Sequence, residues 1–186
     1  MNIKNVFKKT EILLIFFFLA MLLFSYFYFD SSSTIKAKEI LVGNSKQANF
    51  TSIQEAVNNA SFNDTIKVEK NTYNEQVIIN KTIHITANPG TIISCEDFFY
   101  GFYLKCNNST FEGFIFKNNE VGVFIEEGFN NTISNNNFEN NKNGIYFTNS
   151  SSNIVSGNYF ISNSEGIRLF ESSKNIVKNN LFIDHN

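Results

Sequence analysis

The most regular feature of the chain is a pattern of apolar and polar positions that repeats about every 22 residues in its second half. Glycine recurs at Gly122, Gly144 and Gly166, and Gly101 lies one residue short of the same step. A fixed period in this range is typical of stacked structural repeats. The chain from Gly101 onward is therefore interpreted as four aligned copies of one unit.

Apolar residues occupy alternate positions after each aligned glycine, which predicts a short strand with one buried face. Its two apolar columns are Phe102, Val123, Ile145, Ile167 and Leu104, Ile125, Phe147, Leu169. A second strand in each copy supplies Phe111, Ile133, Val155, Val177 and then an all-phenylalanine column at Phe116, Phe138, Phe160, Phe182. Stacked in register, these columns predict one continuous apolar core.

The segments between the strands are rich in asparagine, with columns at Asn131, Asn153, Asn175 and at Asn136, Asn158, Asn180. Asparagine tolerates the left-handed backbone conformation, and identical asparagines in stacked turns can form a hydrogen-bonded ladder. The pattern predicts an all-β fold, a right-handed parallel β-helix (β-solenoid) with about 22 residues per coil. The alternative, an unstructured Asn-rich segment, does not explain the phenylalanine column.

The segment before the regular copies carries a helix signal. Thr51 and Gln54 have the spacing of a capping box, and one helical face carries Ile53, Ala56, Val57 and Ala60. We expect a short amphipathic helix that caps the N-terminal end of the core. The stretches "TIKV", "QVIIN", "KTIHITA" and "TIIS" then predict the first strands.

The N-terminus has the pattern of an export signal. Lys4, Lys8 and Lys9 precede an uncharged apolar run over residues 12–29, which is about the minimum length that spans a bilayer. The absence of a convincing small-x-small cleavage site favours an uncleaved anchor over a removed signal peptide, and the lysines place the head in the cytoplasm. Either alternative exports the rest of the chain.

The predicted organisation is therefore a cytoplasmic basic head (1–11), a transmembrane helix or signal anchor (12–29), a linker (30–39) and a β-helix domain (40–186). The chain stops at "NNLFIDHN", inside a repeat, so we expect the β-helix to be truncated at its C-terminus. The localisation expected is a membrane-anchored protein with an extracellular or periplasmic body, or a secreted one if the segment is cleaved.

Charge and cysteine content exclude some functions. Of 15 basic residues Lys4, Lys8 and Lys9 precede Asp30, whereas only Glu11 of the 17 acidic residues does, so the body is acidic. An acidic body offers no basic surface to nucleic acid. Cys95 and Cys106 are too few for a disulfide scaffold, and one optional disulfide between them stays open.

The order "FTSIQEAVNNA…DTIKVEKNTYNEQVIINKTIHITANPGTIIS", followed by coils with "N-x-I-x-x-N-x-F", resembles the pectin-lyase-like superfamily of right-handed parallel β-helix proteins. Within it, the repeats are most similar to NosD-type and related cell-surface β-helix repeat proteins. The resemblance covers residues 40 to 186 and implies the fold. It implies less about activity, because one fold hosts many functions.

Enzymes of this superfamily use clustered carboxylates on the outer face of one strand column. Aligning "TIHIT" with the strands after each glycine gives an outward column of His84, Tyr103, Phe124, Tyr146 and Arg168, flanked by Lys105 and Glu126. Glycoside hydrolysis needs two suitably placed carboxylates, and this face has no paired aspartate. We therefore predict no catalytic residue. The alternative is a polysaccharide-active lyase, hydrolase or esterase whose catalytic coils are missing or degenerate.

The aromatic members of this column predict a binding surface. Exposed Tyr103, Phe124 and Tyr146 would form an apolar strip able to stack on sugar rings. The alternative is that the rings only pack on one another. We expect a non-catalytic carbohydrate-binding, envelope-binding or structural module, whose partners are a polysaccharide or envelope component and, through the N-terminal helix, the membrane.

Two further chemical signals are weak. The name of the NosD family suggests copper, but the chain has only two histidines, and its methionines are Met1 and Met21, so soft and imidazole ligands are scarce and no metal or other cofactor is predicted. Asn-x-Ser/Thr triplets would permit glycosylation of an exported chain, although an Asn-rich chain also produces them by chance. They begin at Asn49, Asn59, Asn63, Asn80, Asn107, Asn108, Asn130 and Asn149.

Overall fold

The structure is a computed structural model that describes residues 17–19, 21, 36–95 and 98–184. The chain divides into two units, residues 1–36 and residues 37–186, and the second is the β-helix body. The predicted anchor, 12–29, lies outside the described residues apart from 17–19 and 21, which are helical. Within the described ranges, no helix has the length and apolar character needed to cross a membrane.

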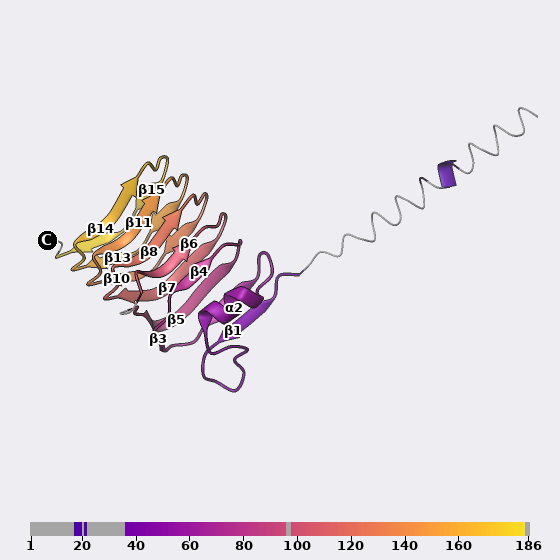
Figure 1. Cartoon of the computed structure of the whole chain (residues 1–186), viewed down its shortest axis with the longest axis horizontal. Helices are drawn as coiled ribbons and strands as arrows, with labels where there is room; N and C mark the ends of the chain where they lie inside the picture. Colours follow the sequence, from indigo (N-terminus) through magenta and orange to yellow (C-terminus); the bar gives the residue numbers. More distant parts are fainter. Residues whose placement is uncertain (1–16, 20, 22–35, 96–97, 185–186) are drawn as a thin grey trace, which may run out of the picture. The chain divides into compact units, whose positions relative to one another are not determined.

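The body is a coil of parallel strands that form two sheets (Figure 1). The five-stranded sheet consists, in spatial order, of β4 (Val77–Ile79), β6 (Tyr100–Leu104), β8 (Val121–Glu126), β11 (Asn143–Thr148) and β14 (Glu165–Phe170). The eleven-stranded sheet has the main order β1 (Glu39–Val42), β2 (Thr65–Val68), β5 (His84–Ile93), β7 (Thr110–Lys117), β10 (Asn137–Glu139), β13 (Tyr159–Ile161), β16 (Leu181–Ile183).

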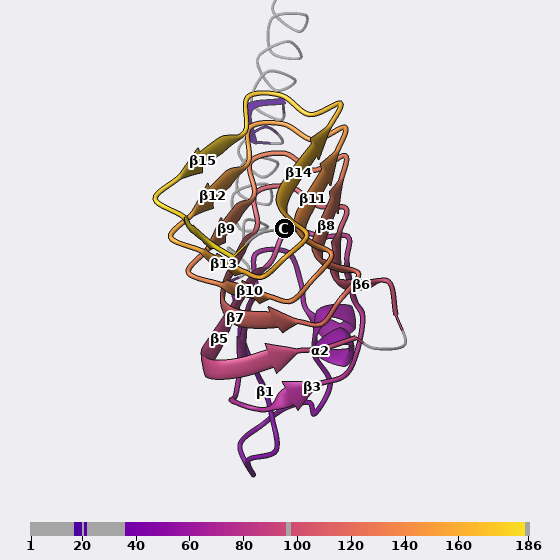
Figure 2. The same cartoon turned by 90° about the vertical axis from the view of Figure 1, so that its left-hand side faces the viewer.

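The eleven-stranded sheet also carries strands outside that order. Strand β3 (Thr72–Tyr73) pairs with β5, and β7 pairs with both β9 and β10. The second row is β9 (Thr132–Ser134), β12 (Ile154–Ser156) and β15 (Ile176–Lys178). Figure 2 shows this row on a different side of the coil from β10 and β13. The all-β parallel solenoid predicted from the sequence is confirmed, and its right-handed sense stays a prediction.

The glycine alignment is confirmed, including the short step at Gly101, and its cause is the close approach of neighbouring coils. A Cβ atom on Gly101 would lie 2.6 Å from the carbonyl oxygen of Gly122, and one on Gly144 would lie 2.5 Å from that of Gly166. Both distances are shorter than real Cβ contacts allow. The glycine column therefore permits the strands of the five-stranded sheet to stack in register.

The predicted core columns are confirmed. The rings of Phe116, Phe138, Phe160 and Phe182 stack with centroid separations of 5.0, 4.9 and 4.8 Å and planes within 8° of parallel. The side chains of Phe116, Phe138 and Phe160 are fully buried. In the last described coil Leu169, Val177 and Phe182 are exposed, because no further coil among the described residues covers them.

The two predicted asparagine ladders are also confirmed. The backbone N–H of Asn136 donates to Oδ1 of Asn158 at 2.9 Å, and the N–H of Asn158 donates in the same way to Asn180. A third ladder, which was not predicted, runs through Asn119, Asn141 and Asn163 at the turn that leads into the five-stranded sheet. Buried backbone N–H groups must find partners, and these side chains supply them.

The helix α2 (Ile53–Asn59) lies where the sequence predicts one, but its start differs. Its N-cap is Ser52, whose Oγ accepts a hydrogen bond from the N–H of Glu55, so the predicted Thr51–Gln54 capping box is wrong. The reason is that Glu75 accepts the N–H groups of Ile53 and Gln54, which leaves the Gln54 side chain to bond elsewhere. Helix α2 contacts β1, β2 and β4 through its buried face.

Candidate functional site

The outward column of the five-stranded sheet forms the centre of the candidate site. Tyr103 on β6, Phe124 on β8, Tyr146 on β11 and Arg168 on β14 are successive partners in register. Their neighbours along each strand point into the core, so these side chains point outward. The structure thus brings together these four residues of the predicted face.

The predicted place of His84 in this column is wrong. His84 lies on β5 in the eleven-stranded sheet, where its partners are Thr65 and Thr110. Ile78 on β4 is the residue that pairs with Tyr103, and its side chain is 44% exposed. The alternation in "KTIHITA" resembles that of the strands after each glycine, but this segment has no aligned glycine and belongs to the other sheet.

The sequence also missed a fourth aromatic residue. Tyr100 stacks on Phe124 with ring centroids 4.7 Å apart and planes at 10°. Its equivalents in later coils are Val121, Asn143 and Glu165, so no aromatic column marked the position. We call the set Tyr100, Tyr103, Phe124 and Tyr146 the aromatic strip.

The rings of the aromatic strip contact one another while remaining partly exposed. The centroid of Phe124 lies 5.3 Å from that of Tyr103 and 5.3 Å from that of Tyr146. Ring-on-ring packing, one of the two alternatives from the sequence, is therefore present. All four side chains nevertheless retain intermediate solvent exposure, so the strip is an apolar surface fixed in position by stacking.

A charged pair borders the strip. The Nζ atom of Lys105 lies 2.7 Å from Oε2 of Glu126, and the Tyr103 hydroxyl donates a short hydrogen bond to the same oxygen. Two hydrogen bonds lower the pKa of Glu126, the larger effect coming from Lys105 and the smaller from Tyr103. The hydrogen bond to Glu126 in turn raises the pKa of Lys105. Burial, followed by the contact with Glu126, raises the pKa of the Tyr103 hydroxyl. The pair is therefore ionised at neutral pH.

Arg168 lies beyond Tyr146, at one end of the face. The guanidinium of Arg168 lies 5.1 Å from the centroid of the Tyr146 ring, within the range of a cation–π contact. Its NH1 atom lies 3.7 Å from a carboxylate oxygen of Glu165. The strip therefore runs between two groups of hydrogen-bond donors and acceptors.

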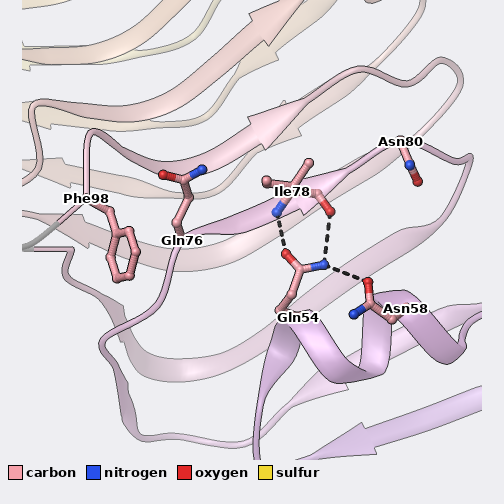
Figure 3. Close-up of a pocket in the computed structure, with 6 residues that line it drawn as sticks. All are labelled: Gln54, Asn58, Gln76, Ile78, Asn80 and Phe98. Atoms are coloured by element: carbon pink, nitrogen blue, oxygen red, sulfur yellow. Dashed lines mark hydrogen bonds between the residues drawn. The ribbon is translucent and has the colours of Figure 1, made fainter.

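An open pocket of about 440 Å³ lies beside Ile78 (Figure 3). The amide of Gln54 accepts a hydrogen bond from the N–H of Ile78 at 2.6 Å and donates to its carbonyl oxygen at 3.3 Å. The side chains of Gln76 and Asn80 make no hydrogen bond to any described residue. The lining is Gln54, Asn58, Gln76, Ile78, Asn80 and Phe98. Because Ile78 pairs with Tyr103, the pocket adds amide groups to one end of the strip.

The cysteines take no part in this face. Cys95 and Cys106 are both free thiols and both buried. Burial raises the pKa of each thiol to about 11. A neutral, buried thiol is a poor nucleophile and metal ligand, so these side chains belong to the core.

Comparison with known proteins identifies the relatives of the chain. Residues 27–186 match the family described as periplasmic copper-binding protein (NosD). A cell surface glycoprotein of Methanothermus fervidus is 33% identical over 90 residues, which is 47% of this chain but only 15% of the glycoprotein. No solved structure matches the chain. The periplasmic family and the cell-surface relative together indicate an extracellular or periplasmic body.

The donor atoms of the described residues do not fit the copper named in the family description. Copper favours imidazole and soft sulfur ligands. Over the described ranges, no three side chains of the types His, Cys, Asp or Glu are grouped so as to hold a metal ion. His84 has no such neighbours on β5, and the two thiols are buried. No step in the function of this face is assigned to a metal.

The fold and the family match agree. The parallel coil and its 22-residue steps lie within the matched residues 27–186. The chain belongs to the NosD family and is a NosD-type parallel β-helix protein.

Proposed function

We propose that this protein is a non-catalytic module of the cell surface that binds a carbohydrate polymer of the envelope through the aromatic strip. The observation that carries the proposal is the register of the strip. Four aromatic rings on three adjacent strands are held in fixed contact on one outward face. Aromatic faces bind well to surfaces that are apolar on one side and polar at the edge, which is the character of a sugar ring.

The polar groups around the strip support recognition of hydroxyl groups. Lys105 and Glu126 offer a donor and an acceptor next to Tyr103, and Gln76 and Asn80 offer unpaired amides near Ile78. Since Lys105 and Glu126 neutralise each other, the centre of the face carries little net charge. We therefore favour a neutral glycan over a strongly charged one.

Two further parts of the proposal concern the helix α2 and the apolar run 12–29. Gln54 of α2 bonds both backbone groups of Ile78 on the edge strand β4, as a neighbouring strand would. We propose that α2 is an N-terminal cap that blocks further pairing at this edge. The apolar run 12–29, which follows three lysines, is proposed to be the anchor that keeps the body at the membrane.

The test is binding of the full chain, in detergent, to an array of cell-envelope glycans. We compare it with a Tyr103→Ala/Tyr146→Ala double variant. Loss of these two rings removes the outer members of the Phe124 stack while leaving the buried columns intact, so we expect binding to fall at least tenfold without a change in circular dichroism.

The matched control is Tyr159→Ala. Tyr159 is 48% exposed on β13 of the eleven-stranded sheet, away from the strip, and its loss should leave binding unchanged. The proposal would be rejected in favour of a purely structural role by either of two results. One is equal weakening of glycan binding in the double variant and in Tyr159→Ala, and the other is that the full chain binds no glycan.

A further inference from the structure

Eight asparagines of the described ranges have a positive φ, and they occupy three places in the coil. We define the exit corner as residues 60–64, 80–83, 105–109, 127–131, 149–153 and 171–175, which lead from α2 or the five-stranded sheet into the eleven-stranded sheet. Four of the eight lie there: Asn63, Asn108, Asn130 and Asn149, with φ between 48° and 64°. The others lie at the opposite corner (Asn118, Asn140) or at the bend of the eleven-stranded sheet (Asn135, Asn179).

The residue two positions later separates these two groups. In the exit corner it is always a hydroxyl residue: Thr65, Thr110, Thr132 or Ser151. In the other two places it is Glu120, Lys142, Asn137 or Leu181. A left-handed turn explains the asparagine, but it does not require the hydroxyl. Among the described asparagines with positive φ, the Asn-x-Ser/Thr triplet is therefore confined to the exit corner.

The structure also divides the eight triplets of the sequence by the state of the side chain. Three asparagine amides are already committed: Asn49 accepts from the N–H of Leu41, Asn59 donates to the carbonyl of Glu55, and Asn107 accepts from the N–H of Phe129. The triplet of Asn80 ends in Thr82, which is buried and donates its hydroxyl to a carbonyl.

The remaining four triplets have free amides. The side chains of Asn63, Asn108, Asn130 and Asn149 are exposed and make no hydrogen bond to another described residue. Their backbone N–H groups bond to the next coil, for example Asn130 to the carbonyl of Ser151, so the turn holds each amide outward. The neighbour Asn131, in contrast, is fully buried in a ladder.

We infer that Asn63, Asn108, Asn130 and Asn149 are acceptor sites for N-linked glycosylation and that their glycans form a ridge along the exit corner. The donor is an oligosaccharide joined through its anomeric carbon to a lipid phosphate. The amide nitrogen Nδ2 forms the new C–N bond, the C–O bond to the phosphate breaks, the lipid phosphate leaves with the electron pair, and the nitrogen loses one proton. The inference requires export and exposure but no ligand on the aromatic strip.

The test is glycopeptide mass spectrometry of the full chain purified from the cells that produce it. We expect glycan-bearing peptides for the four exit-corner asparagines and unmodified peptides for Asn118, Asn135, Asn140 and Asn179. A chain whose mass equals that of the polypeptide would overturn the inference, as would glycans on Asn49, Asn59 or Asn107 with the exit corner bare.

A conservative variant separates the acceptor role from folding. Thr132→Val keeps the β-branched shape at the start of β9 and keeps Asn130, but it removes the hydroxyl of the triplet. It should lose one glycan, at Asn130 alone. Thr72→Val, on a strand with no asparagine two residues earlier, should keep all four. Retention of the Asn130 glycan in Thr132→Val would contradict the assignment.

Discussion

The Oδ1 atom of Asn153 accepts a hydrogen bond from the backbone N–H of Asn131, 2.9 Å away and one coil earlier. The Nδ2 group of Asn153 also donates to the carbonyl of Gly128 at 2.9 Å. The backbone N–H of Asn153 donates in turn to Asn175. One side chain thus supplies the partner of the buried Asn131 N–H and a second donor to the Gly128 carbonyl, which also accepts from the N–H of Ser151.

Replacement of Asn153 by alanine is expected to destabilise the body. The change leaves the buried N–H of Asn131 without its partner, which costs about 1–3 kcal/mol. It also removes one of the two hydrogen bonds to the carbonyl of Gly128, which keeps the bond from the N–H of Ser151. The free energy of unfolding, measured by denaturant titration of the full chain in detergent, should fall accordingly. Asn74→Ala, at an exposed position with no ladder bond, is the control and should change little.

Truncation of the phenylalanine column is expected to cost more. Phe138 stacks between Phe116 and Phe160 and is fully buried. Phe138→Ala should lower the free energy of unfolding by about 3–5 kcal/mol, because it removes buried surface and leaves a cavity. Phe129→Ala, at a side chain that is 43% exposed, serves for comparison. Similar losses in both variants would mean that the stacked column is not the core.

The ion pair beside the strip predicts an acid-side dependence of stability. Hydrogen bonds hold the pKa of Glu126 below its ordinary value of 4.5. The stabilisation that ionised Glu126 adds to the free energy of unfolding is therefore complete above pH 4.5, and it disappears as the pH falls through the lowered pKa. We measure the unfolding midpoint as a function of pH. In Glu126→Gln, the fall of the midpoint on the acid side should lose the part that comes from protonation of Glu126. Glu127→Gln, at the adjacent exposed carboxylate, should retain it, and an unchanged acid profile in Glu126→Gln would contradict the assignment.

The two thiols should be protected in the folded protein. Cys95 and Cys106 are buried and have pKa values raised to about 11 by desolvation, so few thiolates exist at neutral pH. Iodoacetamide should therefore add slowly to the native chain and add twice once the chain is unfolded, as measured by mass spectrometry. Rapid native labelling would show that the thiols are accessible, and failure to label the unfolded chain without reductant would indicate a disulfide.

The sequence predicted the fold where one column of the coil contains one type of residue. Phenylalanine at Phe116, Phe138 and Phe160, or asparagine at Asn136 and Asn158, can be recognised because each coil imposes the same environment at the same position. The predictions also placed Tyr103, Phe124, Tyr146 and Arg168 correctly in one column.

The errors occurred where coils differ. His84 lies in a coil without an aligned glycine, and β5 is a long strand with a register shift between Thr86 and Thr91. Tyr100 is aromatic at a position where the other coils are not. The third ladder was overlooked, although Asn119, Asn141 and Asn163 have the same 22-residue spacing as the two ladders that were predicted.

The equal step between coils has a genetic consequence. Each coil bonds to the coil before it and the coil after it, at a spacing of 22 residues in the regular part of the chain. A tandem duplication of one such unit extends every column and ladder without altering an existing contact, whereas a single inserted residue within a strand turns the following side chains to the wrong face. The length of this protein can therefore change during evolution in whole coils, and the outward face of the five-stranded sheet can lengthen with it.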